Sequence, residues 1–284
     1  MNNLKTVALL AFMTTLLWLV GASLFQGSNG FVIGLVFAVG FNLLAYFFSD
    51  KLALAASRAK PVTEAELPQV YAIVRRLAQQ TRMPEPRIFL IESPQPNAFA
   101  TGRSPRKAAV AVTSGILQVL TVDELEGVLA HELAHVQNRD ILISSIAAMI
   151  ASALTMLARM AFWFGGGGNN RENPLGAIGL ILSLIVAPIA AMLIRLAISR
   201  TREFQADATG AETTGRPMML ASALEKISAG TSRIPMNVNP ATAQLFIDNP
   251  MKAVRGGGMM KLLSTHPPTE ERIDRLTRIA QGIR

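Results

Sequence analysis

The chain has 284 residues, of which 50% are hydrophobic and only 16% are charged, and its formal net charge is +8. Soluble domains average about 25% charged residues, so this composition argues against an ordinary soluble protein and indicates a membrane protein. The absence of cysteine excludes thiolate metal ligands and a cysteine nucleophile. The positive charge suits contact with anionic lipid headgroups, so we expect a lipid bilayer as partner and no nucleic acid.

Four apolar segments predict four membrane spans, because each approaches or exceeds the roughly 18–20 residues that cross a bilayer. A cleaved signal peptide is the alternative for the first segment. The second segment begins five residues later, however, which favours a membrane hairpin. Asn42 lies within the second span, where we expect it to hydrogen-bond to a neighbouring helix. The segments are Val7–Phe25, Phe31–Phe48, Ile141–Phe164 and Leu175–Ile194.

The distribution of basic residues predicts the orientation of these spans. Residues 50–140 hold 11 of the 27 Lys and Arg residues and residues 195–284 hold 13. The loop at 26–30 holds none, and the loop at 165–177 holds only Arg171. By the positive-inside rule, the two basic segments and both termini face the cytoplasm.

Periodicity and turn residues predict the elements of these two basic segments. The pattern indicates a small α+β unit, in which a helix is followed by short strands and then by a second helix. Thr63 with Glu66 and Thr121 with Glu124 form capping-box patterns that open the two helices. The predicted elements are helices at Thr63–Arg82, Arg216–Ala229 and Thr269–Gln281, and strands at Arg87–Ile91, Asn97–Thr101 and Ala108–Thr113.

The helix that opens at Thr121 carries the motif His131-Glu132-Leu133-Ala134-His135. Residues i and i+4 of a helix share a face, so both imidazoles can reach one cation, with Glu132 beside it. Zinc suits such a site: it would lower the pKa of a water molecule, whose proton Glu132 would accept as general base. If the helix runs unbroken into the third span, the metal lies on the order of 10 Å from the bilayer.

A catalytic zinc needs at least one more protein ligand, and two candidates remain open from the residues alone. One is His266, and the other is Glu203, which lies just after the fourth span. Asp207 follows Glu203 by four residues on the same helical face. There it could hydrogen-bond to a ligand imidazole and fix its tautomer.

The chain resembles the HtpX membrane zinc metalloproteases, bacterial relatives of the eukaryotic CAAX prenyl-protein endopeptidases. Four separated motifs carry the resemblance, and it extends over essentially the whole chain. They are His131–His135, Glu203-Phe204-Gln205-Ala206-Asp207, Asn97-Ala98-Phe99-Ala100-Thr101-Gly102 and Ser264-Thr265-His266-Pro267-Pro268.

The resemblance implies one zinc ion per chain in a gluzincin site, with His131, His135 and Glu203 as ligands and Glu132 as general base. It implies that Asn97–Gly102 is an edge strand that could hold an extended substrate by β-augmentation. In the family the counterpart of His266 faces the active site, which makes His266 a candidate oxyanion stabiliser, although capping a turn before Pro267 is the alternative. Arg272 matches a family arginine that could support this corner, although a solvated helix arginine is the alternative.

The expected fold is therefore an α-helical multi-pass membrane protein with four spans and an α+β gluzincin-like zinc peptidase domain on the cytoplasmic side. Membrane hairpins occupy residues 1–49 and 141–198, and the two peptidase parts occupy residues 50–140 and 199–284. The expected substrates are misfolded or damaged membrane proteins, cleaved during stress-related quality control at the bacterial inner membrane.

Two alternatives remain. An intramembrane protease would need the metal motif within a span, but the residues around the motif are rich in charge. A non-proteolytic membrane scaffold or chaperone-like protein would retain the metal site for stability alone. A structural zinc site, however, needs no general base and usually has four protein ligands.

Overall fold

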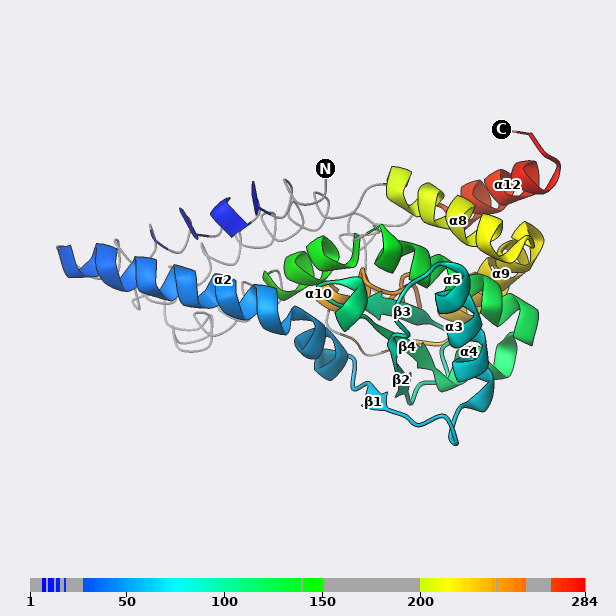
Figure 1. The fold of residues 1–284 in the computed structure, drawn as a ribbon, viewed down its shortest axis with the longest axis horizontal. Coiled ribbons are helices and arrows are strands. Elements are labelled where there is room, and N and C mark those ends of the chain that lie inside the picture. Colours follow the sequence, from blue (N-terminus) through cyan, green and yellow to red (C-terminus); the bar gives the residue numbers. More distant parts are fainter. Residues whose placement is uncertain are drawn as a thin grey trace, which may run out of the picture.

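The computed structural model describes residues 7–8, 10–12, 14–15, 18, 28–138, 140–150, 200–236, 238, 240–253 and 267–283. Within them, a long apolar helix extends from a folded body built of a small sheet and several helices (Figure 1). The predicted fourth span, most of the third and much of the first lie outside the described residues. The four-span layout and the domain boundaries therefore stay predictions.

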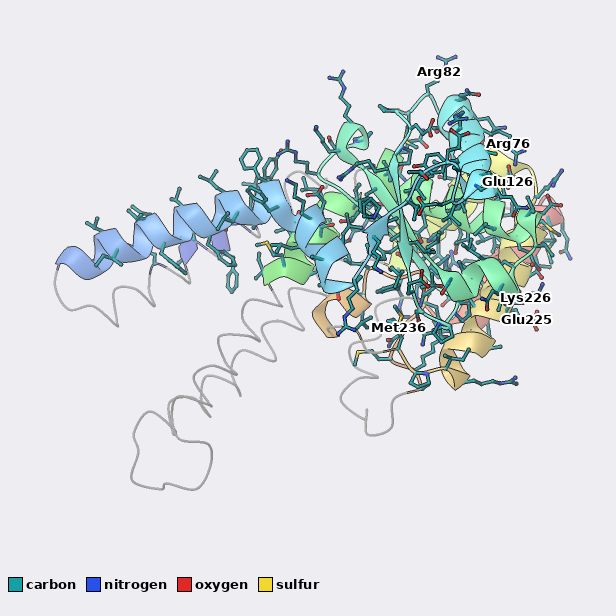
Figure 2. The ribbon with its side chains drawn as sticks, turned by 90° about the horizontal axis from the view of Figure 1, so that it is seen from below. Arg76, Arg82, Glu126, Glu225, Lys226 and Met236 are labelled. Carbon is teal, nitrogen blue, oxygen red and sulfur yellow. The ribbon has the colours of Figure 1, made fainter. Side chains whose placement is uncertain are left out.

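Helix α2, Ser28–Ala56, contains the predicted second span and continues beyond it. Its segment Phe31–Ala56 is 26 residues long and apolar enough to cross a membrane. Large hydrophobic side chains of this helix, among them Val32, Val36 and Phe37, are exposed. Figure 2 shows side chains standing out from the helix along its length. Exposed apolar side chains along a whole helix are what a lipid-facing helix requires.

Asn42 joins α2 to the first apolar segment, as the sequence predicted. Its side-chain amide donates hydrogen bonds to the carbonyl oxygen of Leu10 at 3.0 Å and to Oγ1 of Thr14 at 2.6 Å. The rings of Trp18 and Phe31 also meet, with centroids 5.6 Å apart. The described residues of the first segment thus lie beside α2.

The sheet contains four strands in the order β1-β2-β4-β3. β2 pairs with β4 in parallel, while β1 with β2 and β3 with β4 are antiparallel. The three predicted strands are present, two of them one residue shorter at their starts. The strands are β1 Lys60–Pro61, β2 Arg87–Ile91, β3 Ala98–Thr101 and β4 Ala109–Thr113.

Both faces of the sheet are buried, and alternate residues of β4 divide between them. Val110 and Val112 face the main core, which they share with residues of helices α3, α5 and α9. Ala109 and Ala111 face a second core, which contains Leu54 from the end of α2 together with Phe99 and Phe246. The long apolar helix α2 is therefore anchored directly on the sheet.

Helix α3, Pro68–Gln80, begins five residues later than the capping-box pattern predicted. The hydroxyl and the backbone amide of Thr63 both donate to Oε2 of Glu66, each at 2.7 Å, but they do so in a turn before the helix. Pro68 takes the first helical position, where its missing N–H costs nothing. The prediction of a helix start at Thr63 was wrong for this reason.

Helix α5, Val122–Gln137, has the capping box that the sequence predicted, formed by Thr121 and Glu124. It ends at Gln137, and a separate helix covers Asp140–Ile150. The expected unbroken run into the third span was therefore wrong. The remaining elements are α4 Ser114–Val119, α8 Arg200–Thr214, α9 Pro217–Arg233, α10 Pro240–Ala243, α12 Thr269–Ala280 and the 3₁₀ turn Pro105–Lys107.

Glycines allow the helices around α5 to approach it closely. A Cβ on Gly210 of α8 would lie 3.0 Å from the backbone nitrogen of His131. A Cβ on Gly127 of α5 would lie 3.0 Å from the backbone nitrogen of Leu220 on α9. Both distances are shorter than an ordinary van der Waals contact, so a side chain at either position would clash with the neighbouring helix. Gly210 thus lets α8 approach α5 closely, and Gly127 does the same for α9.

Glu124 links the start of α5 to α9. Its carboxylate accepts hydrogen bonds from Ser222 at 2.6 Å, from Lys226 at 2.8 Å and from the backbone amide of Thr121 at 2.8 Å. Burial alone would raise the pKa of this carboxyl group, but the hydrogen bonds lower it from 4.5 to about 2. The charged form of Glu124 therefore stabilises the fold.

This shift predicts how stability depends on pH. Because the pKa in the folded state lies below that in the unfolded state, the contribution of Glu124 is complete above pH 4.5 and is lost as the pH falls toward 2. We expect Glu124→Gln to lower the free energy of unfolding at neutral pH by about 1–3 kcal/mol. The loss should shrink in acid, as measured by thermal unfolding in detergent at neutral pH and near pH 3.

Glu225→Gln is the matched control, since Glu225 is the exposed neighbour of Lys226 on α9 (Figure 2). It should leave both the stability and its pH dependence unchanged. Equal acid sensitivity in the wild-type protein and in Glu124→Gln would contradict the assignment.

Candidate metal centre

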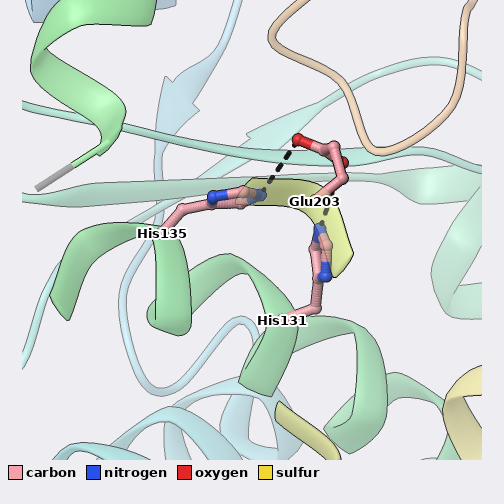
Figure 3. Close-up of side chains that lie close together, drawn as sticks. All are labelled: His131, His135 and Glu203. Carbon is pink, nitrogen blue, oxygen red and sulfur yellow. Dashed lines mark ion pairs between the residues drawn. The ribbon is translucent and has the colours of Figure 1, made fainter. Parts of the chain in front are cut away.

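Helices α5 and α8 bring together two histidines and a carboxylate that the sequence predicted as zinc ligands. Nε2 of His135 lies 3.4 Å from Oε1 of Glu203, and Nε2 of His131 lies 3.9 Å from Oε2 of the same residue (Figure 3). One ligand atom from each residue falls within 4.8 Å of the others. Neighbouring ligands of a tetrahedral zinc ion are about 3.3 Å apart, so this donor set fits zinc.

The site lies in the interior of the folded body. His131 and Glu203 are buried, and His135 is partly exposed. The two imidazole rings meet nearly at right angles, with centroids 4.7 Å apart. This arrangement leaves one side of the cluster accessible beside His135, which a catalytic metal needs in order to meet water and substrate.

Asp207 holds His131 by the nitrogen that does not face Glu203. Oδ1 of Asp207 lies 2.9 Å from Nδ1 of His131. A carboxylate accepts the proton on Nδ1 and so leaves Nε2 free to bind a metal. The sequence predicted this role for Asp207 from its spacing to Glu203.

Arg272 of α12 holds Asp207 in turn. Its guanidinium donates to both carboxylate oxygens, at 2.6 and 2.9 Å, and also to the carbonyl oxygen of Ile247 at 3.2 Å. Only 2% of Arg272 is exposed, so the alternative of a solvated arginine is wrong. α12 is thereby tied to the metal centre through one buried ion pair.

The charges of the site act on the two histidines in opposite directions. Burial and the nearby Arg272 charge lower the pKa of His131 to about 4, despite the contact with Asp207. Burial would also lower the pKa of His135, but Glu203 and Asp140 raise it to about 10. Burial opposes the charge of Asp207, yet Arg272 lowers the pKa of this carboxyl group to about 2.

Glu132 contacts the sheet. Its Oε2 accepts a hydrogen bond of 2.7 Å from the backbone amide of Ala100 in β3. The predicted general base is thus held between the metal-binding face of α5 and the predicted substrate strand. This contact fixes the direction in which its carboxylate points.

β3 is an edge strand, as expected, but part of its outer side is already occupied. The carbonyl oxygen of Ala98 accepts a hydrogen bond of 2.8 Å from the backbone amide of Ile247. Asn97 fixes the same segment, because its side-chain amide donates to the carbonyl oxygen of Asp248 at 2.9 Å. Any substrate on this strand must therefore pair toward Thr101 and Gly102, beyond the segment that contains Ile247.

The structure does not describe His266, so its role stays a prediction. Sequence analysis assigned no role to two residues beside the site, Asp140 and Arg202. Oδ2 of Asp140 lies 3.3 Å from Nδ1 of His135, and Arg202 lies beside Asp140. Their signal in the sequence is weak: Asp140 follows His135 by five residues, a spacing that a continuous helix does not bring together.

Comparison with known proteins agrees with this geometry. The model of peptidase family M48 matches residues 64–280. The chain is 50% identical to a protease HtpX homolog of Thermodesulfovibrio yellowstonii, over 99% of each protein. It is 51% identical to a protease HtpX homolog of Desulfatibacillum aliphaticivorans, over 97% of this chain and 89% of that protein.

The crystal structure of S. mikatae Ste24p has a similar fold, with a TM-score of 0.51 and 21% sequence identity. That likeness covers 97% of this chain and 65% of the Ste24p chain. Metallopeptidases of family M48 are in general zinc-dependent, and His131, His135 and Glu203 form a group that could bind such an ion. The family match and the near-complete similarity to HtpX homologs establish that this chain belongs to peptidase family M48 and is a metallopeptidase.

Proposed function

We propose that this chain is a membrane-bound, zinc-dependent endopeptidase that cleaves misfolded or damaged membrane proteins at the cytoplasmic face of a bacterial inner membrane. Its role would be stress-related protein quality control. The observation that carries the proposal is the buried cluster of His131, His135 and Glu203, which has Glu132 beside it and lies in a body anchored to the apolar helix α2.

His131, His135 and Glu203 would hold the zinc ion. Bound there, zinc would polarise the substrate carbonyl and make water more acidic. The remaining steps fall to side chains of this chain. Glu132 would accept the proton of the attacking water and later deliver it to the leaving amine, as a general base and then a general acid.

The hydrogen bond between Glu132 and Ala100 supports this role. It holds the carboxylate at the edge of β3, where an extended substrate would pair with the strand. Within the predicted substrate strand Asn97–Gly102, the end at Thr101 and Gly102 would align the substrate backbone, so that the scissile carbonyl lies next to the general base. His266 would stabilise the negative charge that develops on this carbonyl oxygen.

The end of α2 supports a position at the membrane surface. The cation of Lys51 lies over the ring of Phe48 at 5.2 Å, and the guanidinium of Arg103 lies over the ring of Phe47 at 4.9 Å. Aromatic and basic residues gather where a span leaves the bilayer. Arg103 lies just after β3, so the proposed substrate strand ends close to this surface.

This geometry favours chains that emerge from the bilayer, or fail to settle in it, as substrates. The non-catalytic scaffold has no observation in its favour, since the chain belongs to a peptidase family and keeps a general base. An intramembrane site is disfavoured because α5, which carries the metal motif, packs in the core of the folded body. The exposed apolar side chains that would face lipid belong to α2 instead.

The first test separates the general base from the metal ligands. Glu132→Gln should retain zinc but lose about 10²–10⁴-fold in peptidase activity, because an amide cannot accept the proton of water. Glu203→Ala should lose both zinc and activity. Zinc content and cleavage of an unfolded protein substrate are measured on the purified full-length chain.

Glu126→Gln is the control for this experiment, since it makes the same chemical change six residues earlier on α5. Glu126 pairs with the half-exposed Arg76 at 2.7 Å (Figure 2). Glu126 is buried, but its side chain points about 120° away from that of Glu132 around the helix axis, so zinc content and activity should remain near wild type. Full proteolysis by Glu132→Gln would refute the mechanism.

The second test addresses the side of the membrane on which the body lies. The chain has no cysteine, so single introduced cysteines give an unambiguous label. Arg106→Cys should react with a membrane-impermeant maleimide only in inside-out vesicles, whereas Ser28→Cys should react only in intact spheroplasts. The reverse pattern would place the body on the outer side.

A further inference from the structure

We propose that Asp140 is a positioning residue for the zinc ligand His135, and that Arg202 holds Asp140 in place. The metal centre would then contain two His–Asp–Arg groups, one for each ligand histidine. The first is His131–Asp207–Arg272. The second, His135–Asp140–Arg202, rests on the proposed zinc-dependent function.

The two ring nitrogens of His135 face different partners. Nε2 lies 3.4 Å from Oε1 of Glu203, on the metal-binding side, and Nδ1 lies 3.3 Å from Oδ2 of Asp140. An ionised carboxylate can only accept a hydrogen bond. Asp140 therefore selects the tautomer of His135 that carries its proton on Nδ1, which leaves the lone pair of Nε2 for the metal.

Burial makes a counter-charge for Asp140 necessary. Only 4% of Asp140 and 8% of Arg202 are exposed, and a buried carboxylate without a nearby cation is costly. Nη1 of Arg202 lies 3.6 Å from Oδ1 of Asp140, the oxygen that does not face His135. Each oxygen of Asp140 thus has its own neighbour, which holds the carboxylate in one orientation.

The break after α5 is what allows Asp140 to reach His135. In a continuous helix, a residue five positions later is rotated by about 140° around the axis and points away. α5 ends at Gln137, Asn138 lies in a turn, and Asp140 belongs to the helical segment described at Asp140–Ile150. Because α5 ends before Asp140, the spacing of a continuous helix does not apply, and Oδ2 of Asp140 lies 3.3 Å from Nδ1 of His135.

Arg202 adds a link between the two ligand-bearing helices. It directly precedes Glu203 on α8, while Asp140 follows the α5 helix that carries His135. The pair therefore ties the turn of α8 that presents Glu203 to the residue that orients His135. A small shift between the helices would move two zinc ligands together.

The two His–Asp–Arg groups differ in tightness. Arg272 donates two hydrogen bonds to Asp207, of 2.6 and 2.9 Å. The side-chain nitrogens of Arg202, in contrast, make no hydrogen bond among the described residues. The first group therefore also holds the fold together. The second acts mainly on the metal site, so removing it should weaken zinc binding more than it weakens folding.

The test uses the full-length protein in detergent and measures zinc affinity by competition with a chelator. Asp140→Asn should raise the zinc Kd by about 10- to 100-fold, because an outer hydrogen-bond partner of a ligand imidazole is lost. Asp140→Glu should recover part of the affinity, since it keeps the carboxylate. Excess zinc should restore peptidase activity to Asp140→Asn.

Two further measurements distinguish positioning from a merely structural role. Asp140→Asn should lower the unfolding temperature of the zinc-bound protein by more than that of the metal-free protein, and the absorption spectrum of the cobalt-substituted protein should shift. Arg202→Gln should weaken zinc binding less than Asp140→Asn does, because it acts through Asp140.

Asp123→Asn is the control, since this exposed residue at the start of α5 pairs only with Arg216 among the described residues.

A zinc Kd within twofold of wild type in both Asp140→Asn and Arg202→Gln would overturn the inference. So would a loss of affinity accompanied by an equal loss of stability in the metal-free protein. These outcomes leave the proposed function intact as long as the wild-type protein binds zinc and Glu132→Gln is inactive. If the wild-type protein itself binds no zinc, the proposed function fails.

Discussion

The site depends on the close packing of α5 against α8. Gly210 faces the backbone of His131, so the two helices approach more closely there than a side chain would permit. That approach brings Glu203 to within 3.4 Å of His135 and places Asp207 on His131. All three proposed zinc ligands, and the carboxylate that orients one of them, follow from a single interhelical contact.

Such a cluster is costly unless its charges compensate one another. His131, Glu203, Asp207 and Arg272 are almost completely buried, and buried charges are tolerated only when they are paired and hydrogen-bonded. The bidentate contact between Arg272 and Asp207 supplies this compensation on one side of the site. A bound cation would compensate Glu203 on the other side, so we expect metal binding to stabilise the fold.

The sheet connects this centre to the membrane helix. The end of α2 packs on one face of the sheet through Leu54, and α5 packs on the opposite face. β3 contacts Glu132, the proposed general base, through Ala100 and ends near Arg103, which stacks on Phe47 of α2. The proposed base, substrate strand and membrane surface are thus joined through a few short, rigid contacts.

The sequence by itself determined the local features: the apolar helix, three of the four strands, the capping box at Thr121 and the pairing of His131 with His135, because each follows from a pattern within one continuous segment. It also indicated Glu203 and Asp207, whose spacing puts them on one helical face. The predicted start of α3 was five residues too early, because the helix begins at Pro68 and not at the capping-box pattern. The prediction that α5 runs on unbroken was also wrong, because this helix ends at Gln137. Only the tertiary structure decided that Asp140 faces His135, that Arg272 is buried on Asp207 and that Ile247 occupies part of β3, because these contacts join segments whose approach no local periodicity encodes.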